Sequence, residues 1–145
     1  MESLEKLKPL ALLLLRLGLA AIFIYHGYPK LFTHTREALQ GFTHMGFPPF
    51  FAYVAGVIEF FGGCLLVVGL FTRVASLLLA GEMGVALIQV HKILSAPRAV
   101  DKYEFPLALA VGAFALAAVG PGLISLDQAI YGERRSASRK PKNKG

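Results

Sequence analysis

The fold is decided by residues 10–32, which read LALLLLRLGLAAIFIYHGYPKLF. This apolar run is long enough to cross a bilayer, because about 20 residues at a rise of about 1.5 Å each span roughly 30 Å of hydrocarbon. It nevertheless contains Arg16, His26 and Lys30. A charged side chain deep in a membrane is costly, so these groups are expected to face other helices or a wet cavity. Residues 10–32 therefore predict a membrane span whose polar groups need partners elsewhere in the chain.

The composition of the whole chain also favours a membrane protein. Hydrophobic residues make up 55% of the 145 residues, above the usual share in a soluble domain. The formal net charge is +6, but much of it lies in the tail from Arg134 to Lys144, which favours an anionic membrane face or an orientation signal over a nucleic acid. Cys64 is the single cysteine. A single cysteine excludes CxxC redox chemistry and cysteine-based metal sites within the chain. No metal site is predicted.

Three more apolar stretches follow the first one, and together they predict an all-α integral membrane four-helix bundle. The expected spans are about 10–32, 51–71, 74–92 and 103–122. Four spans place both termini on one side of the membrane. Nine Lys and Arg residues would lie on that side and five on the other, which favours both termini in the cytoplasm.

Two short helices are expected at the membrane interface. Residues 33–51 are too polar to span, but Leu39 and Phe42 share one face of a helix predicted from Thr35 to Met45. Ser125 and Gln128 have the spacing of a capping box, which predicts a second interfacial helix through Tyr131, after the fourth span. The bundle would then occupy residues 1–132, followed by a basic, disordered tail at 133–145.

The depth of each polar residue in its span suggests how the buried charges pair. At a rise of 1.5 Å per residue, Arg16 matches Glu82 near the cytoplasmic side, and we predict a structural ion pair between them. By the same measure, His26 is expected to pair with Glu59 near the outer side. Lys30, Gln89 and His91 lie at that outer depth, so a ligand pocket is predicted there, lined by His26, Lys30, Glu59, Gln89 and His91. Hydrogen-bond donors beside a proton acceptor suit a quinone head group.

Several short motifs follow one another over most of residues 16–127. They are Arg16-x-Gly18, His26-Gly27-x-x-Lys30-Leu31, Gly46-x-Pro48, Glu59-x-x-Gly62-Gly63-x-Leu65-Leu66-x-x-Gly69, Thr72-Arg73, Glu82-Met83, His91 and Gly120-Pro121-Gly122-x-x-Ser125-Leu126-Asp127. In this order, the motifs resemble those of the DoxX family. The resemblance implies a small four-helix membrane protein in a bacterial-type cytoplasmic membrane. It also implies relatives in quinone-linked oxidoreductases and thiol-redox membrane complexes.

Three functions are compatible with these residues. The first is a membrane subunit of a quinone-linked redox system, which binds a quinone or a partner oxidoreductase at the outer pocket. The second is a non-catalytic assembly subunit of a larger complex, and the third is a carrier of small solutes or protons. The chain has no haem-attachment motif and no nucleotide fingerprint. A bound quinone or a partner is therefore expected to supply any electron carrier, and no catalytic residue is assigned. The chain itself is expected to bind a protein partner or to form a homo-oligomer.

Overall fold

The protein is a helical bundle whose four long helices match the predicted spans. A computed structural model describes residues 2–90, 98 and 100–138. Its long helices are α2 (Lys8–Tyr28), α4 (Phe51–Val68), α5 (Thr72–Val85) and α6 (Val100–Val119). Short π-helices extend α2 through η1 (Pro29–Thr33) and α5 through η2 (Ala86–Val90). With these extensions, four helices among the described residues are long and apolar enough to span a membrane. The predicted all-α membrane bundle is confirmed.

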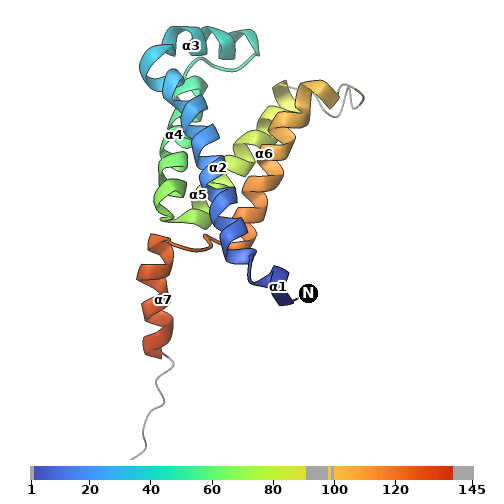
Figure 1. The fold of residues 1–145 in the computed structure, drawn as a ribbon. Coiled ribbons are helices and arrows are strands. Elements are labelled where there is room, and N and C mark those ends of the chain that lie inside the picture. The colour runs from blue at the N-terminus through green and yellow to red at the C-terminus, as the bar shows by residue number, and fades with distance from the viewer. Residues whose placement is uncertain (1, 91–97, 99, 139–145) are drawn as a thin grey trace, which may run out of the picture.

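The helices pack as two pairs that meet side by side. Helix α2 packs mainly on α4, α5 packs mainly on α6, and α4 joins the pairs by contacting α5. The two pairs lie close together near the chain termini and diverge toward the other end (Figure 1). We call these two ends of the bundle the terminal end and the α3 end. The shared core takes side chains from all four helices, namely Leu19, Ala20, Phe23, Leu66, Ala75, Leu79, Leu109, Ala113 and Leu116.

Glycine allows α2 and α4 to approach closely. A Cβ atom added to Gly27 would lie 2.5 Å from the backbone nitrogen of Phe60, and one added to Gly63 would lie 2.7 Å from Ile24 Cγ1. Small residues at such contacts bring helix backbones together where no hydrophobic force distinguishes a neighbouring helix from lipid. Large apolar side chains such as Leu14, Leu77 and Phe114 point outward and are exposed, as a lipid environment requires.

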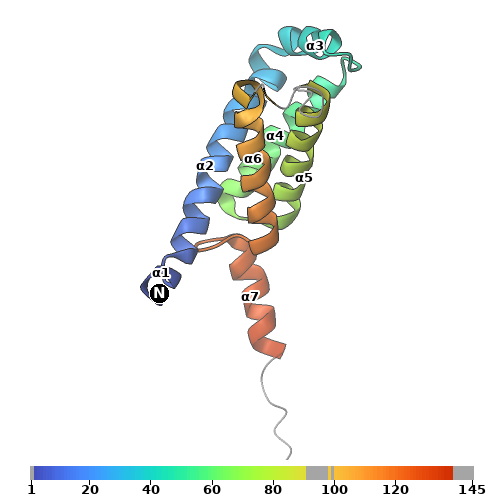
Figure 2. The same ribbon diagram turned by 90° about the vertical axis from the view of Figure 1, so that its right-hand side faces the viewer.

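The predicted short helix after the first span is present. Helix α3 (Thr35–His44) lies across one end of the bundle, roughly perpendicular to the long helices (Figures 1 and 2). Its chain turns at Gly46, whose φ of +86° lies in the left-handed region that glycine adopts at little cost. Leu39 and Phe42 are half-buried, whereas Arg36, Glu37 and His44 are exposed. The amphipathic pattern therefore covers the bundle end as expected.

The terminal end is held by the segment that follows α6. The carboxylate of Asp127 accepts hydrogen bonds from the backbone N–H groups of Phe71 and Thr72, both at 2.8 Å, and so caps the start of α5. In return, the Asp127 N–H donates to the carbonyl of Gly69 at 2.9 Å. Arg73 donates to the carbonyls at the end of α6, including that of Ala118 at 2.7 Å. Both ends of the α4–α5 turn are therefore fixed by the C-terminal segment.

Helix α7 (Leu126–Ser138) begins where the capping pattern predicts, with the Gln128 N–H donating to Ser125 Oγ at 3.2 Å. It is longer than expected and continues beyond Tyr131 through Ser138, so residues 133–138 are helical where a disordered tail was predicted. It also projects away from the bundle and does not lie across its end (Figures 1 and 2). The rest of the predicted tail, 139–145, lies outside the described residues.

Candidate functional site

A cavity of about 640 Å³ lies at the α3 end, between α4 and α5. Helix α4 contributes Phe51, Val54 and Ile58 to its wall, and α5 with η2 contributes residues from Leu77 to Val90. Phe42 of α3, together with Met45 and Phe47 after it, completes the wall. The cavity is therefore largely apolar and depends on α3 for one of its sides.

Among the described residues, three ionisable side chains line this largely apolar cavity: Lys30, Glu59 and Glu82. The Lys30 ammonium donates a hydrogen bond to Glu59 Oε2 and forms an ion pair with it. The side chain of Glu59 is only 5% exposed and that of Lys30 is 23% exposed. A carboxylate buried to this degree needs a partner, and losing one member of such a pair typically costs about 3–5 kcal/mol.

The close approach of α2 to α4 explains why Lys30 reaches Glu59. A Cβ atom added to Gly56 would lie 3.1 Å from Lys30 Cβ, so the lysine stem runs directly over this glycine. Glu59 lies three residues after Gly56 and therefore on the same face of α4. The long lysine stem can pack along that face while its ammonium meets the carboxylate.

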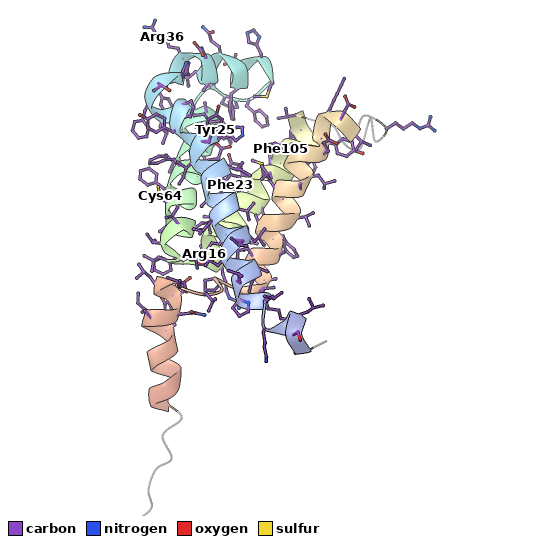
Figure 3. The ribbon with its side chains drawn as sticks, in the orientation of Figure 1. Arg16, Phe23, Tyr25, Arg36, Cys64 and Phe105 are labelled. Carbon is purple, nitrogen blue, oxygen red and sulfur yellow. The ribbon has the colours of Figure 1, made fainter. Side chains whose placement is uncertain are left out.

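The ion pair predicted between His26 and Glu59 is not formed, because Lys30 occupies the carboxylate. His26 is exposed, and its ring packs against Tyr25 and Phe105 with centroid distances of 5.6 and 5.9 Å. Tyr25 and Phe105 lie on the two helices that diverge toward the α3 end (Figure 3). His26 is not among the residues that line the cavity, so the structure separates it from the predicted pocket.

The predicted ion pair between Arg16 and Glu82 is also corrected. Arg16 is 1% exposed and donates two hydrogen bonds of 2.7 Å, to the carbonyl oxygens of Pro121 and Ile124. The segment after α6 folds against the first turns of α2, where a Cβ atom on Gly122 would lie 2.7 Å from Leu12 Cβ. The guanidinium of Arg16 is therefore bound by backbone carbonyls and not by the carboxylate of Glu82. Figure 3 shows Arg16 at the terminal end of the bundle.

Glu82 belongs to the cavity and not to an ion pair with Arg16. It lines the cavity with Lys30 and Glu59. Its Oε2 atom is buried and has no hydrogen-bond partner among the described residues. Glu82 was predicted to form a structural ion pair, but it lines the same cavity as Lys30 and Glu59, which were predicted to bind a ligand.

The remaining two predicted pocket residues do not join the cavity. Gln89 is exposed in η2 and is not part of the cavity wall, although its neighbours Ala86 and Val90 are. His91 lies outside the described residues. Of the five predicted ligand-binding residues, the structure therefore brings together Lys30 and Glu59, and it adds Glu82.

Sequence reasoning missed the large apolar residues that close the cavity from α3 and the segment after it. Phe42, Met45 and Phe47 come from the connection between the first two spans, which was interpreted as packing material over the bundle. The amphipathic pattern of residues 35–45 identified the helix and its inward face. A depth argument cannot show that this face covers a hollow, because it assigns positions along the membrane normal and not around the bundle.

The site can bind a molecule that is mainly apolar and carries a polar head. An ammonium has three N–H donors, so Lys30 can donate to a ligand oxygen while it stays paired with Glu59. Phe51, Val54, Leu77, Leu78 and Val85 line the cavity and are themselves exposed, so the cavity has an open apolar rim. A ligand with an apolar tail therefore has a lateral route to the cavity from the bilayer.

Comparisons with known proteins agree with the membrane fold. The family model DoxX matches residues 11–92. The chain is 34% identical to "Putative oxidoreductase CatD" of Bacillus subtilis, over 87% of this chain and 91% of that protein. It is 34% identical to "Inner membrane protein YphA" of Escherichia coli, over 83% of this chain and 91% of that protein. A Haemophilus influenzae protein of undescribed function is 41% identical over 63% of this chain and 66% of its own length. No solved structure matches the chain significantly.

Proposed function

The chain belongs to the DoxX family of membrane proteins, and from this premise we propose that it is the membrane subunit of a quinone-linked redox system. The quinone would bind in the cavity between α4 and α5, with its head group beside Lys30 and Glu59. The observation that carries the proposal is this buried ion pair in the wall of an otherwise apolar cavity. The electron donor would be a partner oxidoreductase.

The size and chemistry of the cavity support a quinone. Its volume of about 640 Å³ falls in the range of about 300–1,000 Å³ that is typical of small-molecule sites. Such sites are mostly apolar with a few polar groups that orient the ligand. A quinone oxygen accepts hydrogen bonds, and Lys30 is the donor in the wall. The exposed apolar rim allows an isoprenoid tail to extend into the bilayer.

Relatives and charge distribution support the setting of this function. The Bacillus subtilis relative is named as an oxidoreductase, and the Escherichia coli relative as an inner membrane protein. The excess of Lys and Arg at the terminal end favours both termini in the cytoplasm. The cavity would then lie in the outer half of the cytoplasmic membrane, where α3 covers it.

Titration of the purified protein with a short-chain quinone tests the proposal. We expect the quinone to raise the unfolding temperature and to bind in a calorimetric titration. Replacing Lys30 with Met should weaken the affinity about 10- to 100-fold, because a hydrogen bond from a charged donor contributes about 1.5–3 kcal/mol. Lys102→Met serves as the matched control, since Lys102 is exposed at the start of α6.

Each alternative outcome has a clear meaning. If the quinone binds neither the wild type nor the variants, the quinone assignment is wrong, and a stable partner that copurifies from native membrane would favour an assembly subunit. Equal affinity for the wild type and Lys30→Met would show that the quinone binds elsewhere.

A further inference from the structure

The charged groups in the cavity do not balance. Glu59 and Glu82 contribute two carboxylates, whereas Lys30 contributes one ammonium, which is already paired with Glu59. Glu59 disfavours an ionised Glu82 and Lys30 favours it. Among the described residues, the exposed ionisable side chains at this end of the bundle are Tyr25, His26, Tyr28, His34, Arg36, Glu37, His44, Tyr53, Arg98, Asp101, Lys102 and Glu104, while Tyr103 of α6 is buried. Among the residues that the structure describes, one negative charge in the cavity therefore has no counter-charge beside it.

The position of Glu82 makes an ionised carboxylate there expensive. Its Oε2 atom is buried and accepts no hydrogen bond from any described residue. An ionised carboxylate with a buried oxygen that accepts no hydrogen bond costs more than the neutral acid in the same place, so such a group favours binding a proton or a cation. Among the described residues there is no group of three or more metal-ligating side chains. A proton is therefore the better counter-charge.

We propose that Glu82 holds one exchangeable proton in the empty cavity, and that this proton is governed by the pairing of Lys30. While Lys30 is paired with Glu59, Glu82 is the neutral acid. When Glu59 is neutralised, Lys30 is released to balance Glu82, which then gives up its proton. The inference goes beyond quinone binding, since it concerns the cavity without a ligand, and it places a proton donor beside any bound head group.

Infrared spectroscopy of the ligand-free protein, in the protonated-carboxyl region and with deuterium exchange, tests this proposal directly. Charge balance sets the number of neutral cavity carboxyls as the number of carboxylates minus the number of ammonium groups. We expect one such carboxyl in the wild type, none in Glu82→Gln, none in Glu59→Gln and two in Lys30→Met.

Glu37→Gln is the matched control, because Glu37 is an exposed glutamate on α3, and its spectrum should equal that of the wild type. Circular dichroism and gel filtration identify variants that are folded, and the four variants give independent readings if one fails to fold. A band that persists in Glu82→Gln, or no band in the wild type, overturns the proposal. Failure of quinone binding would leave these spectra unchanged, so the two proposals fail separately.

Discussion

Replacement of Arg16 with Met should destabilise the protein strongly, even though Arg16 forms no ion pair with the charged residues of the cavity. Its guanidinium donates two hydrogen bonds of 2.7 Å to the carbonyls of Pro121 and Ile124. The contribution of one hydrogen bond to the free energy of unfolding ranges from about 0.6 kcal/mol in membrane proteins to about 3 kcal/mol for charged donors. We therefore expect a loss of about 2–4 kcal/mol in the free energy of unfolding, and about half of that for Arg16→Lys.

Reversible unfolding in mixed detergent micelles measures these losses. Arg36→Met is the matched control, because Arg36 is an exposed arginine on α3 (Figure 3), and its effect should stay within about 0.5 kcal/mol. A double-mutant cycle of Arg16→Met with Glu82→Gln separates the carbonyl contacts from the ion pair that the sequence suggested. The two effects should add within about 0.5 kcal/mol.

Two results would refute the role of Arg16 described above. A loss below about 1 kcal/mol in Arg16→Met would show that the two hydrogen bonds are not stabilising. A coupling energy above about 1 kcal/mol between Arg16 and Glu82 would show that the two side chains interact after all.

Three further predictions concern the cap, the helix contact and the cavity. Asp127→Asn should lower the free energy of unfolding by about 1 kcal/mol in the same assay, since the N-terminus of α5 loses a charged cap; a neutral effect would contradict the capping role. Gly63→Ala should cost about 1–3 kcal/mol, because its Cβ would overlap Ile24. Gly81→Ala, with nothing within 4 Å, is its control and should be neutral or stabilising. Phe42→Ala should weaken quinone binding severalfold in calorimetry, because Phe42 lines the cavity from α3; unchanged affinity would show that α3 does not contact the ligand.

The helices were predictable because hydrophobicity along the chain is a local property. The four spans and the short helix near residues 35–45 follow from apolar runs and helical periodicity, and the structure contains all five within a few residues of the predicted bounds. The extent of α7 was not predictable from the same pattern. Its polar, basic sequence resembles a disordered tail, yet it continues as a helix through Ser138.

The pairing of the charges was not predictable, because depth alone leaves the direction around each helix open. His26 and Lys30 lie within one turn of each other, and only the contact of Lys30 with Gly56 decides which of them meets Glu59. Arg16 was predicted to pair with the carboxylate of Glu82. Its actual acceptors are backbone carbonyls, which every residue has, so the sequence does not identify them. Of the five residues predicted to bind a ligand, Lys30 and Glu59 line the cavity at the α3 end.

The hydrogen bonds of Arg16 also bear on how the chain is inserted into the membrane. Its acceptors lie 105 and 108 residues further along the chain, beyond the last span. When the first span emerges from the ribosome, those acceptors have not yet been synthesised. Membrane helices first insert separately and then assemble, so Arg16 must remain at a wet or protein-lined site until the fourth span has joined the others. The contact can therefore form only after residues 121–124 have been synthesised and have folded against α2.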